Sequence, residues 1–124
     1  MKFIALVFAL SSFSTFAATV HSAKLDASKK NILVDVSYGG GCKKHTFTLK
    51  MGACLETYPV QCSAELVEKT IGGFDACEAI VGQTVTINLA KYRLDEAYFT
   101  RGSLAITGDR DMNGQPSSAT VILP

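Results

Sequence analysis

Apolar and polar residues alternate along most of this chain, and the three- to four-residue spacing typical of amphipathic helices is nearly absent. Residues 31–38, for example, place Ile32, Val34 and Val36 on one face and Asp35 and Ser37 on the other. The alternation predicts strands at 18–25, 31–38, 44–51, 60–68, 84–89, 103–107 and 118–123. We therefore expect an all-β domain of about seven short strands.

Each predicted strand has one apolar face, so a sheet built from them needs a second sheet to cover it. This favours a small antiparallel β-sandwich of immunoglobulin-like architecture, or a small barrel. The chain has no tryptophan, so an antibody-type domain is not supported. Three segments depart from the alternation: the glycines at 39–41 are expected to end a strand, 71–81 to form an ordered loop, and 91–100 to form a helical turn with Leu94, Ala97 and Tyr98 on one face.

The N-terminal residues have the layout of a secretory signal peptide. Lys2 supplies a positive charge, an apolar run follows from Phe3 to Leu10, and small residues lead up to Ala17. That run is too short to span a bilayer, which requires about 20 residues. We predict a signal peptide at 1–17 and a single β-rich domain at 18–124, with cleavage after Ala18 as the alternative. The protein is therefore expected to be secreted or periplasmic, with no transmembrane segment after cleavage.

Without Lys2 the chain carries eleven basic and eleven acidic residues. A neutral chain with scattered basic residues lacks the electrostatic attraction that nucleic-acid binding requires, so no nucleic-acid partner is expected.

Four cysteines, an even number in a chain with an export signal, predict two disulfide bonds. Cys54 and Cys62 flank a turn-like segment, and Cys42 and Cys77 enclose it. The spacing favours Cys42–Cys77 with Cys54–Cys62, and the crossed pairings stay open.

His45 follows Cys42 in a C-x-x-H spacing, which suits a zinc ion only if further thiolates stay reduced. A small hydrolase built around His45 is a second hypothesis, although the G-x-S-x-G and H-E-x-x-H motifs are absent. The simpler interpretation places His45 on the polar or rim face of a strand, hydrogen-bonded to a neighbour. No catalytic residue is assigned.

Asp109, Asp111 and Asn113 stand at alternate positions before Gly114, which matches the first half of a calcium-binding loop. The glutamate that completes such a loop is missing, because Thr120 holds its position. A polar hairpin loop uses the same residue types. Calcium at this loop is therefore the one cofactor hypothesis, and a turn is its alternative.

The pattern G-G-G-C-x-x-H-x-F, followed by Pro59-Val60-Gln61 and by Asp75-Ala76-Cys77-Glu78-Ala79, resembles small exported bacterial domains of uncharacterised function. The resemblance covers the middle third of the chain and implies no activity. It supports the pairing of Cys42 with Cys77.

These observations favour a non-enzymatic binding or structural domain, inhibitor-like in one version, that contacts an unknown protein or surface ligand through rigid loops such as 54–62 or 109–115. The alternatives are a calcium-stabilised adhesion module and a small hydrolase or metal-binding protein using His45. The tyrosines and Phe99 are scattered singly, which is more typical of core and edge positions than of an aromatic binding surface.

Overall fold

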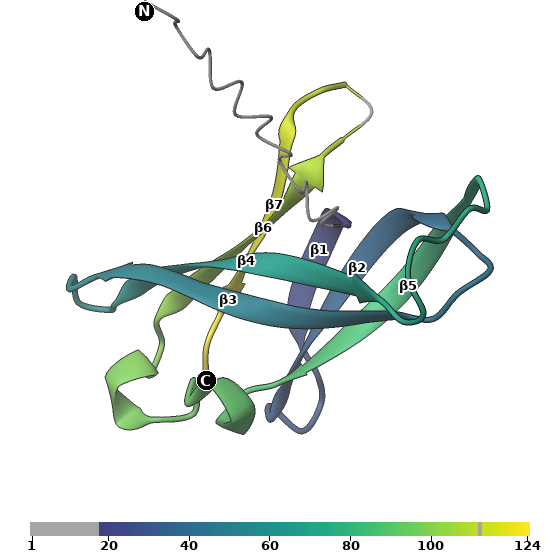
Figure 1. The fold of residues 1–124 in the computed structure, drawn as a ribbon. Coiled ribbons are helices and arrows are strands. Elements are labelled where there is room, and N and C mark those ends of the chain that lie inside the picture. The colour runs from purple at the N-terminus through teal and green to yellow at the C-terminus, as the bar shows by residue number, and fades with distance from the viewer. Residues whose placement is uncertain (1–17, 112) are drawn as a thin grey trace, which may run out of the picture.

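A computed structural model describes residues 18–111 and 113–124, so the predicted signal peptide at 1–17 lies outside the described residues. The described chain forms seven strands and two short 3-10 helices (Figure 1). In chain order these are β1 (Thr19–Leu25), β2 (Asn31–Gly40), β3 (His45–Leu55), β4 (Gln61–Thr70), β5 (Ala79–Asn88), η1 (Ala90–Tyr92), η2 (Ala97–Phe99), β6 (Ser103–Arg110) and β7 (Pro116–Ile122). None of the helices in the described part of the chain has the length and apolar character to cross a membrane.

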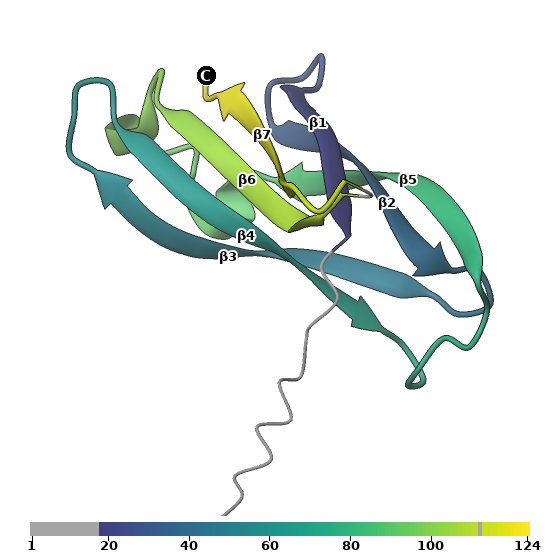
Figure 2. The ribbon, with the colours of Figure 1, turned by 90° about the horizontal axis from the view of Figure 1, so that it is seen from above.

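The strands form two sheets that face each other across one core (Figure 2). One sheet has the strand order β1-β2-β5 and the other β3-β4-β6-β7. The alternation explains the core, because the inward positions of both sheets carry apolar side chains that are almost fully buried: Ile32, Val34, Val36, Cys62, Ala64, Leu66, Val85, Ile87, Leu104 and Ile106. The prediction of a small all-β sandwich is confirmed.

One pairing differs from the antiparallel arrangement that we predicted. β4 and β6 run parallel, with Cys62 beside Leu104 and Ala64 beside Ile106. Between these strands the chain crosses to the other sheet, forms β5, and returns through η1 and η2. It thus enters β6 in the same direction as β4, and such a crossover is what a parallel neighbour requires.

β2 ends within the glycine run at 39–41, as expected, but two residues later than the predicted end at Tyr38. β2 continues through Gly39 and Gly40, and Gly40 pairs with Ala79, so β5 begins within the segment that we predicted to be a loop. A Cβ atom at Gly40 would lie 2.5 Å from Oδ2 of Asp75 and 2.9 Å from Nε2 of His45, and φ is +147°. The glycine therefore makes room for these two side chains.

The predicted helical turn at 91–100 is also only partly right. The structure has two separate 3-10 turns, η1 and η2, and Arg93 ends the first with a left-handed φ of 58°. Leu94 is buried, whereas Ala97 and Tyr98 are exposed, so the three do not share one buried face. Side chains three residues apart eclipse in a 3-10 helix, so α-helical spacing does not apply here.

The β6–β7 hairpin connects the two sheets by closing against β1. The amide of Asp109 donates to the carbonyl of Ala18 at 3.1 Å, and the amide of Val20 donates to Oγ of Ser117 at 3.1 Å. A Cβ atom at Gly108 would overlap the Ala18 carbonyl oxygen, so only glycine permits this close approach. Ala18 is buried by these contacts and forms the N-terminal end of the described fold.

Candidate functional site

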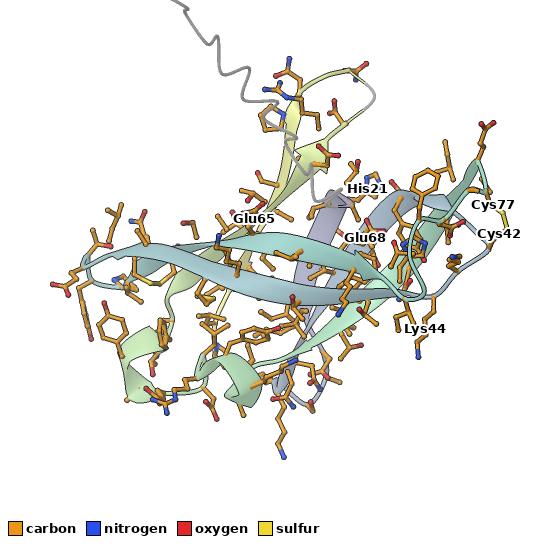
Figure 3. The ribbon with its side chains drawn as sticks, viewed as in Figure 1. His21, Cys42, Lys44, Glu65, Glu68 and Cys77 are labelled. Atoms are coloured by element: carbon orange, nitrogen blue, oxygen red, sulfur yellow. A yellow bond between two sulfur atoms is a disulfide. The ribbon has the colours of Figure 1, made fainter. Side chains whose placement is uncertain are left out.

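The two disulfides lie at opposite ends of the β3–β4 hairpin, and Figure 3 labels the cysteines of one of them, Cys42–Cys77. Cys42–Cys77 joins the turn after β2 to the loop before β5, and Cys54–Cys62 joins two residues that are paired across β3 and β4. This is the pairing that the spacing favoured, and all four cysteines are in disulfide bonds. Each end of the hairpin presents a different arrangement of side chains.

The first arrangement, which we call the His45 cluster, consists of His45, Glu68 and Asp75. Glu68 lies on β4 (Figure 3), His45 begins β3, and Asp75 lies in the loop that follows β4. Nδ1 of His45 hydrogen-bonds to Oε1 of Glu68, and Nε2 lies 2.8 Å from Oδ2 of Asp75. The exposed fractions of the three side chains are 2% for His45, 6% for Glu68 and 3% for Asp75. The cluster is therefore a buried bridge between strands and loop.

Asp75 also holds the turn that carries Cys42. Its Oδ2 accepts hydrogen bonds from the amides of Gly41, Cys42 and Lys43 at 3.2, 3.3 and 3.0 Å, and its Oδ1 accepts one from the amide of Cys77 at 3.1 Å. One carboxylate thus receives four main-chain donors around the Cys42–Cys77 disulfide. Such donors stabilise the ionised form of a buried carboxylate.

The charge states in the cluster support one another. The hydrogen bond from His45 is the largest cause that lowers the pKa of Asp75; burial opposes it, and the main-chain amides of Lys43, Cys77 and Cys42 add to the lowering. Burial by itself lowers the pKa of His45, but the hydrogen bonds to Asp75 and Glu68 outweigh it, so the pKa is raised above its ordinary value. We therefore assign His45 as an imidazolium that donates from both ring nitrogens.

This arrangement leaves no ring nitrogen of His45 free to act as a base. Both nitrogens donate to carboxylates, and the only other hydrogen-bond partner recorded among the described residues is Oγ1 of Thr70, 3.3 Å from Nδ1. The ring of Tyr38 covers the imidazole, with the two ring centroids 4.3 Å apart. Burial, followed by the charges of Glu68 and Asp75, raises the pKa of Tyr38. Our expectation that His45 hydrogen-bonds to neighbouring residues is confirmed, but the expected polar or rim position is wrong, because His45 is buried on the inward face of β3.

The zinc hypothesis for Cys42 and His45 does not suit these donors. The potential ligand atoms of Cys42, Asp75 and Cys77 lie within 4.8 Å of one another, but the two sulfur atoms are bonded to each other. Zinc binds thiolates, and a disulfide offers none. In the disulfide-bonded protein the His45 cluster is a structural clamp at the floor of an open cleft of about 330 Å³.

Sequence reasoning missed Glu68 and Asp75. A usable signal was present for Glu68, because it continues the inward positions of β4 after Ala64 and Leu66, just as His45 occupies the inward series of β3. Two ionisable residues on the apolar faces of paired strands predict a buried pair. Asp75 had no such signal, since it reaches His45 from a loop thirty residues away.

The candidate calcium residues lie in the β6–β7 hairpin, and their hydrogen bonds fit the turn alternative. Oδ1 of Asp111 accepts the amides of Asn113 and Gln115, both at 2.9 Å, and Oδ1 of Asp109 accepts the amide of Arg110 at 2.8 Å. The guanidinium of Arg110 donates to the carbonyl of Gly114 at 2.6 Å, which places a cation inside the loop. Asp109 lines the cleft above His45, whereas Asp111 lines a separate pocket.

The second arrangement, which we call the Tyr58 loop, is the segment from Cys54 to Cys62. The Cys54–Cys62 disulfide clips the base of the hairpin turn, and Oγ1 of Thr57 donates to the carbonyl of Pro59 at 2.8 Å within it. Tyr58 is fully exposed at 103%, and Leu55 is 62% exposed. The loop is therefore closed by a covalent bond while it holds two apolar side chains in solvent.

A groove of about 620 Å³ lies between the Tyr58 loop and η2. Its lining includes Tyr58 and Pro59 from the loop, Tyr98 from η2, and Arg101. Tyr98 is 54% exposed and rests edge-on against Phe99, with ring centroids 4.9 Å apart. We expected the scattered tyrosines to occupy core or edge positions, but the fold brings Tyr58 and Tyr98 to the same exposed groove.

Comparisons with known proteins give no indication of function, so the proposal below rests on the geometry of the two arrangements. No protein-family model matches the chain, and no curated protein matches it either. The resemblance to small exported bacterial domains therefore stays a prediction.

Proposed function

We propose that this chain is an exported, non-enzymatic domain that binds another protein through the Tyr58 loop. The observation that carries the proposal is the full exposure of Tyr58 on a hairpin turn clipped by Cys54–Cys62, beside a groove that Tyr98 also lines. The loop projects from the end of a long hairpin (Figure 1), which suits insertion into a concave site of the partner in the manner of an inhibitor.

The energetics of protein interfaces support Tyr58 as the anchor. A tyrosine ring buries about 150–250 Å² on binding, and tyrosine is among the residues enriched at binding hot spots. A loop closed by a disulfide has less conformational freedom to lose, which lowers the cost of ordering it at an interface. Leu55 adds a second exposed apolar side chain on the same loop.

Two further observations support the remaining parts of the proposal. Two disulfides fit an oxidising compartment, in agreement with the signal-peptide layout of the first seventeen residues. The engagement of both ring nitrogens of His45 by Glu68 and Asp75 favours a binding domain over a hydrolase that would use His45 as its base.

Quantitative capture tests this function. The immobilised, disulfide-bonded protein is exposed to extract from the compartment of the cells that make it, and each captured protein is titrated against wild type, Tyr58→Ala and Phe74→Ala. Phe74 is the matched control, since it is an 81% exposed aromatic residue in the loop beside the other disulfide. We expect Tyr58→Ala to weaken binding about 30-fold, the loss typical of a hot-spot residue, and Phe74→Ala to leave it unchanged. Equal binding by all three proteins would contradict the proposal.

A further inference from the structure

β5 is an outer strand of its sheet, which has the order β1-β2-β5. Half of the main-chain groups of an outer strand have no partner within the sheet and point away from it. β5 pairs with β2 over ten residues without a register shift. The amide of Leu89, which follows β5, donates to the carbonyl of Lys30, the residue that precedes β2. Because hydrogen-bonded pairs alternate in an antiparallel ladder, the odd-numbered residues of β5 bond to β2. The N–H and C=O groups of Ile80, Gly82, Thr84 and Thr86 therefore face outward.

The other sheet edges of the described fold are each protected. β1 and β7 meet through the contacts of Ala18, Val20 and the β6–β7 hairpin, and β7 begins with Pro116. On β3 the amide of Leu49 donates to the hydroxyl of Tyr92 at 3.0 Å, and the strand carries a register shift after Met51. Prolines, bulges and covering groups are the devices by which proteins prevent edge pairing.

β5 has none of these devices within its ten residues. It contains no charged residue and no proline, and its ladder has no bulge. No hydrogen bond recorded among the described residues uses the main chain of Ile80, Gly82, Thr84 or Thr86 on the outward side. Ile80 is also 77% exposed. An edge of this length that is both uncharged and unprotected is a site for strand pairing.

We propose that β5 pairs with β5 of a second copy of this chain to form an antiparallel dimer with one continuous six-stranded sheet. A two-fold axis beside Gln83 sets Gly82 opposite Thr84 of the partner subunit and Ile80 opposite Thr86 of the partner subunit. The hydrogen-bonded pairs of this register all join two outward-facing residues, so the main-chain donors and acceptors of both edges are matched.

The charge pattern favours a second copy over an unrelated strand. Identical edges repel each other wherever they carry charge, and β5 carries none, although 19% of the whole chain is charged. Outside the signal segment the chain has equal numbers of acidic and basic residues, so two copies approach without net repulsion. The pairing is isologous, because both subunits contribute the same strand. It occupies the one unprotected edge in the described part of each subunit, so no further copy can add and the assembly stops at a dimer.

The test measures the mass in solution of the protein purified after export with both disulfides formed. Sedimentation equilibrium from micromolar to millimolar concentration should give twice the chain mass for wild type. Gly82→Lys should give the single-chain mass, because it sets two like charges diagonally across the two-fold axis. Gly39→Lys is the matched control and should stay dimeric. Gly39 lies opposite Ile80 on the interior strand β2, and a Cβ atom at Gly39 or at Gly82 meets no atom within 4 Å.

Amide hydrogen exchange adds a readout that identifies the surface. The amides of Gly82, Thr84 and Thr86 should exchange slowly in wild type and rapidly in Gly82→Lys. A monomeric wild type, a dimer that Gly82→Lys leaves intact, or a dimer with unprotected amides at these positions would each overturn the proposal. A monomer that instead binds an extended segment of a different protein along β5 would overturn the choice of a second copy. None of these outcomes bears on the Tyr58 loop, which lies on the other sheet.

Discussion

Replacing His45 with alanine removes the imidazolium that lies between two buried carboxylates. Glu68 and Asp75 would then face each other across the vacated space with no cation between them, although their side chains are only 6% and 3% exposed in the intact protein. Removing one partner of a buried ion pair costs about 3–5 kcal/mol of unfolding free energy, because the remaining charge stays uncompensated. The total free energy of unfolding of a domain of this size is roughly 5–15 kcal/mol, so the loss is a large fraction of its stability.

The expected effect depends on pH, and its sign follows from the direction of each pKa shift. The pKa of His45 is raised in the folded protein, so its contribution is complete below its ordinary value of 6.5 and is lost as the pH rises through the folded pKa. The pKa of Asp75 is lowered, so its contribution is complete above the ordinary value of 3.8 and is lost as the pH falls toward the folded pKa. The contribution of the cluster is therefore largest between about pH 4 and pH 6.5.

Urea unfolding of wild type and His45→Ala at several pH values measures both effects. With an m-value of about 2 kcal/mol/M, a loss of 3–5 kcal/mol shifts the midpoint by roughly 2 M. The difference in unfolding free energy between wild type and His45→Ala should be largest near pH 5.5 and smaller at alkaline pH.

His21→Ala is the matched control. His21 is exposed on β1 and hydrogen-bonds to Ser37, so its removal should change stability by no more than about 0.5 kcal/mol. If His45→Ala costs less than about 1 kcal/mol, or if its cost does not vary with pH, the assignment of a buried imidazolium is refuted.

Three further changes test other parts of the structure. Opening the nine-residue ring with Cys54→Ser and Cys62→Ser should lower the unfolding free energy by about 2.5 kcal/mol on the chain-entropy model, measured by urea unfolding; an unchanged midpoint would show that this disulfide does not constrain the chain. Gly108→Ala should destabilise the fold by about 1–3 kcal/mol, because its Cβ atom overlaps the Ala18 carbonyl oxygen, and a variant with the wild-type melting temperature would contradict that close approach. Calcium should leave the melting temperature equal to that in chelator, since Oδ1 of Asp111 already accepts two main-chain amides; a rise with calcium would restore the calcium-loop hypothesis.

The strands could be predicted from the sequence because each buries one face, and burial of one face imposes a period of two on apolar residues. The inward positions of β2 and β4, from Ile32 to Val36 and from Cys62 to Leu66, follow this rule residue by residue. Strand ends and pairing directions did not follow from it. Gly39 and Gly40 stay in the ladder because β5 pairs with them there, and that pairing is not encoded locally.

The candidate sites depended on contacts between distant segments, which is why the sequence revealed them only in part. The position of Glu68 on an inward face could have indicated a buried partner for His45. Asp75 could not be found in this way, since its role comes from a loop held against the turn at Gly41 to Lys43. Tyr58 and Tyr98 lie 40 positions apart, and only the folded chain brings them to one groove.

Site-specific photocrosslinking tests the proposed protein-binding function most directly. A photoreactive phenylalanine analogue replaces Tyr58 in one version of the protein and Phe74 in another, and each is irradiated in the cells that make it. Both side chains are exposed, but they lie in loops beside different disulfides. The account predicts a discrete crosslinked product of the same protein partner at position 58 and none at position 74. The absence of any adduct at position 58, or the same adduct at both positions, would contradict it.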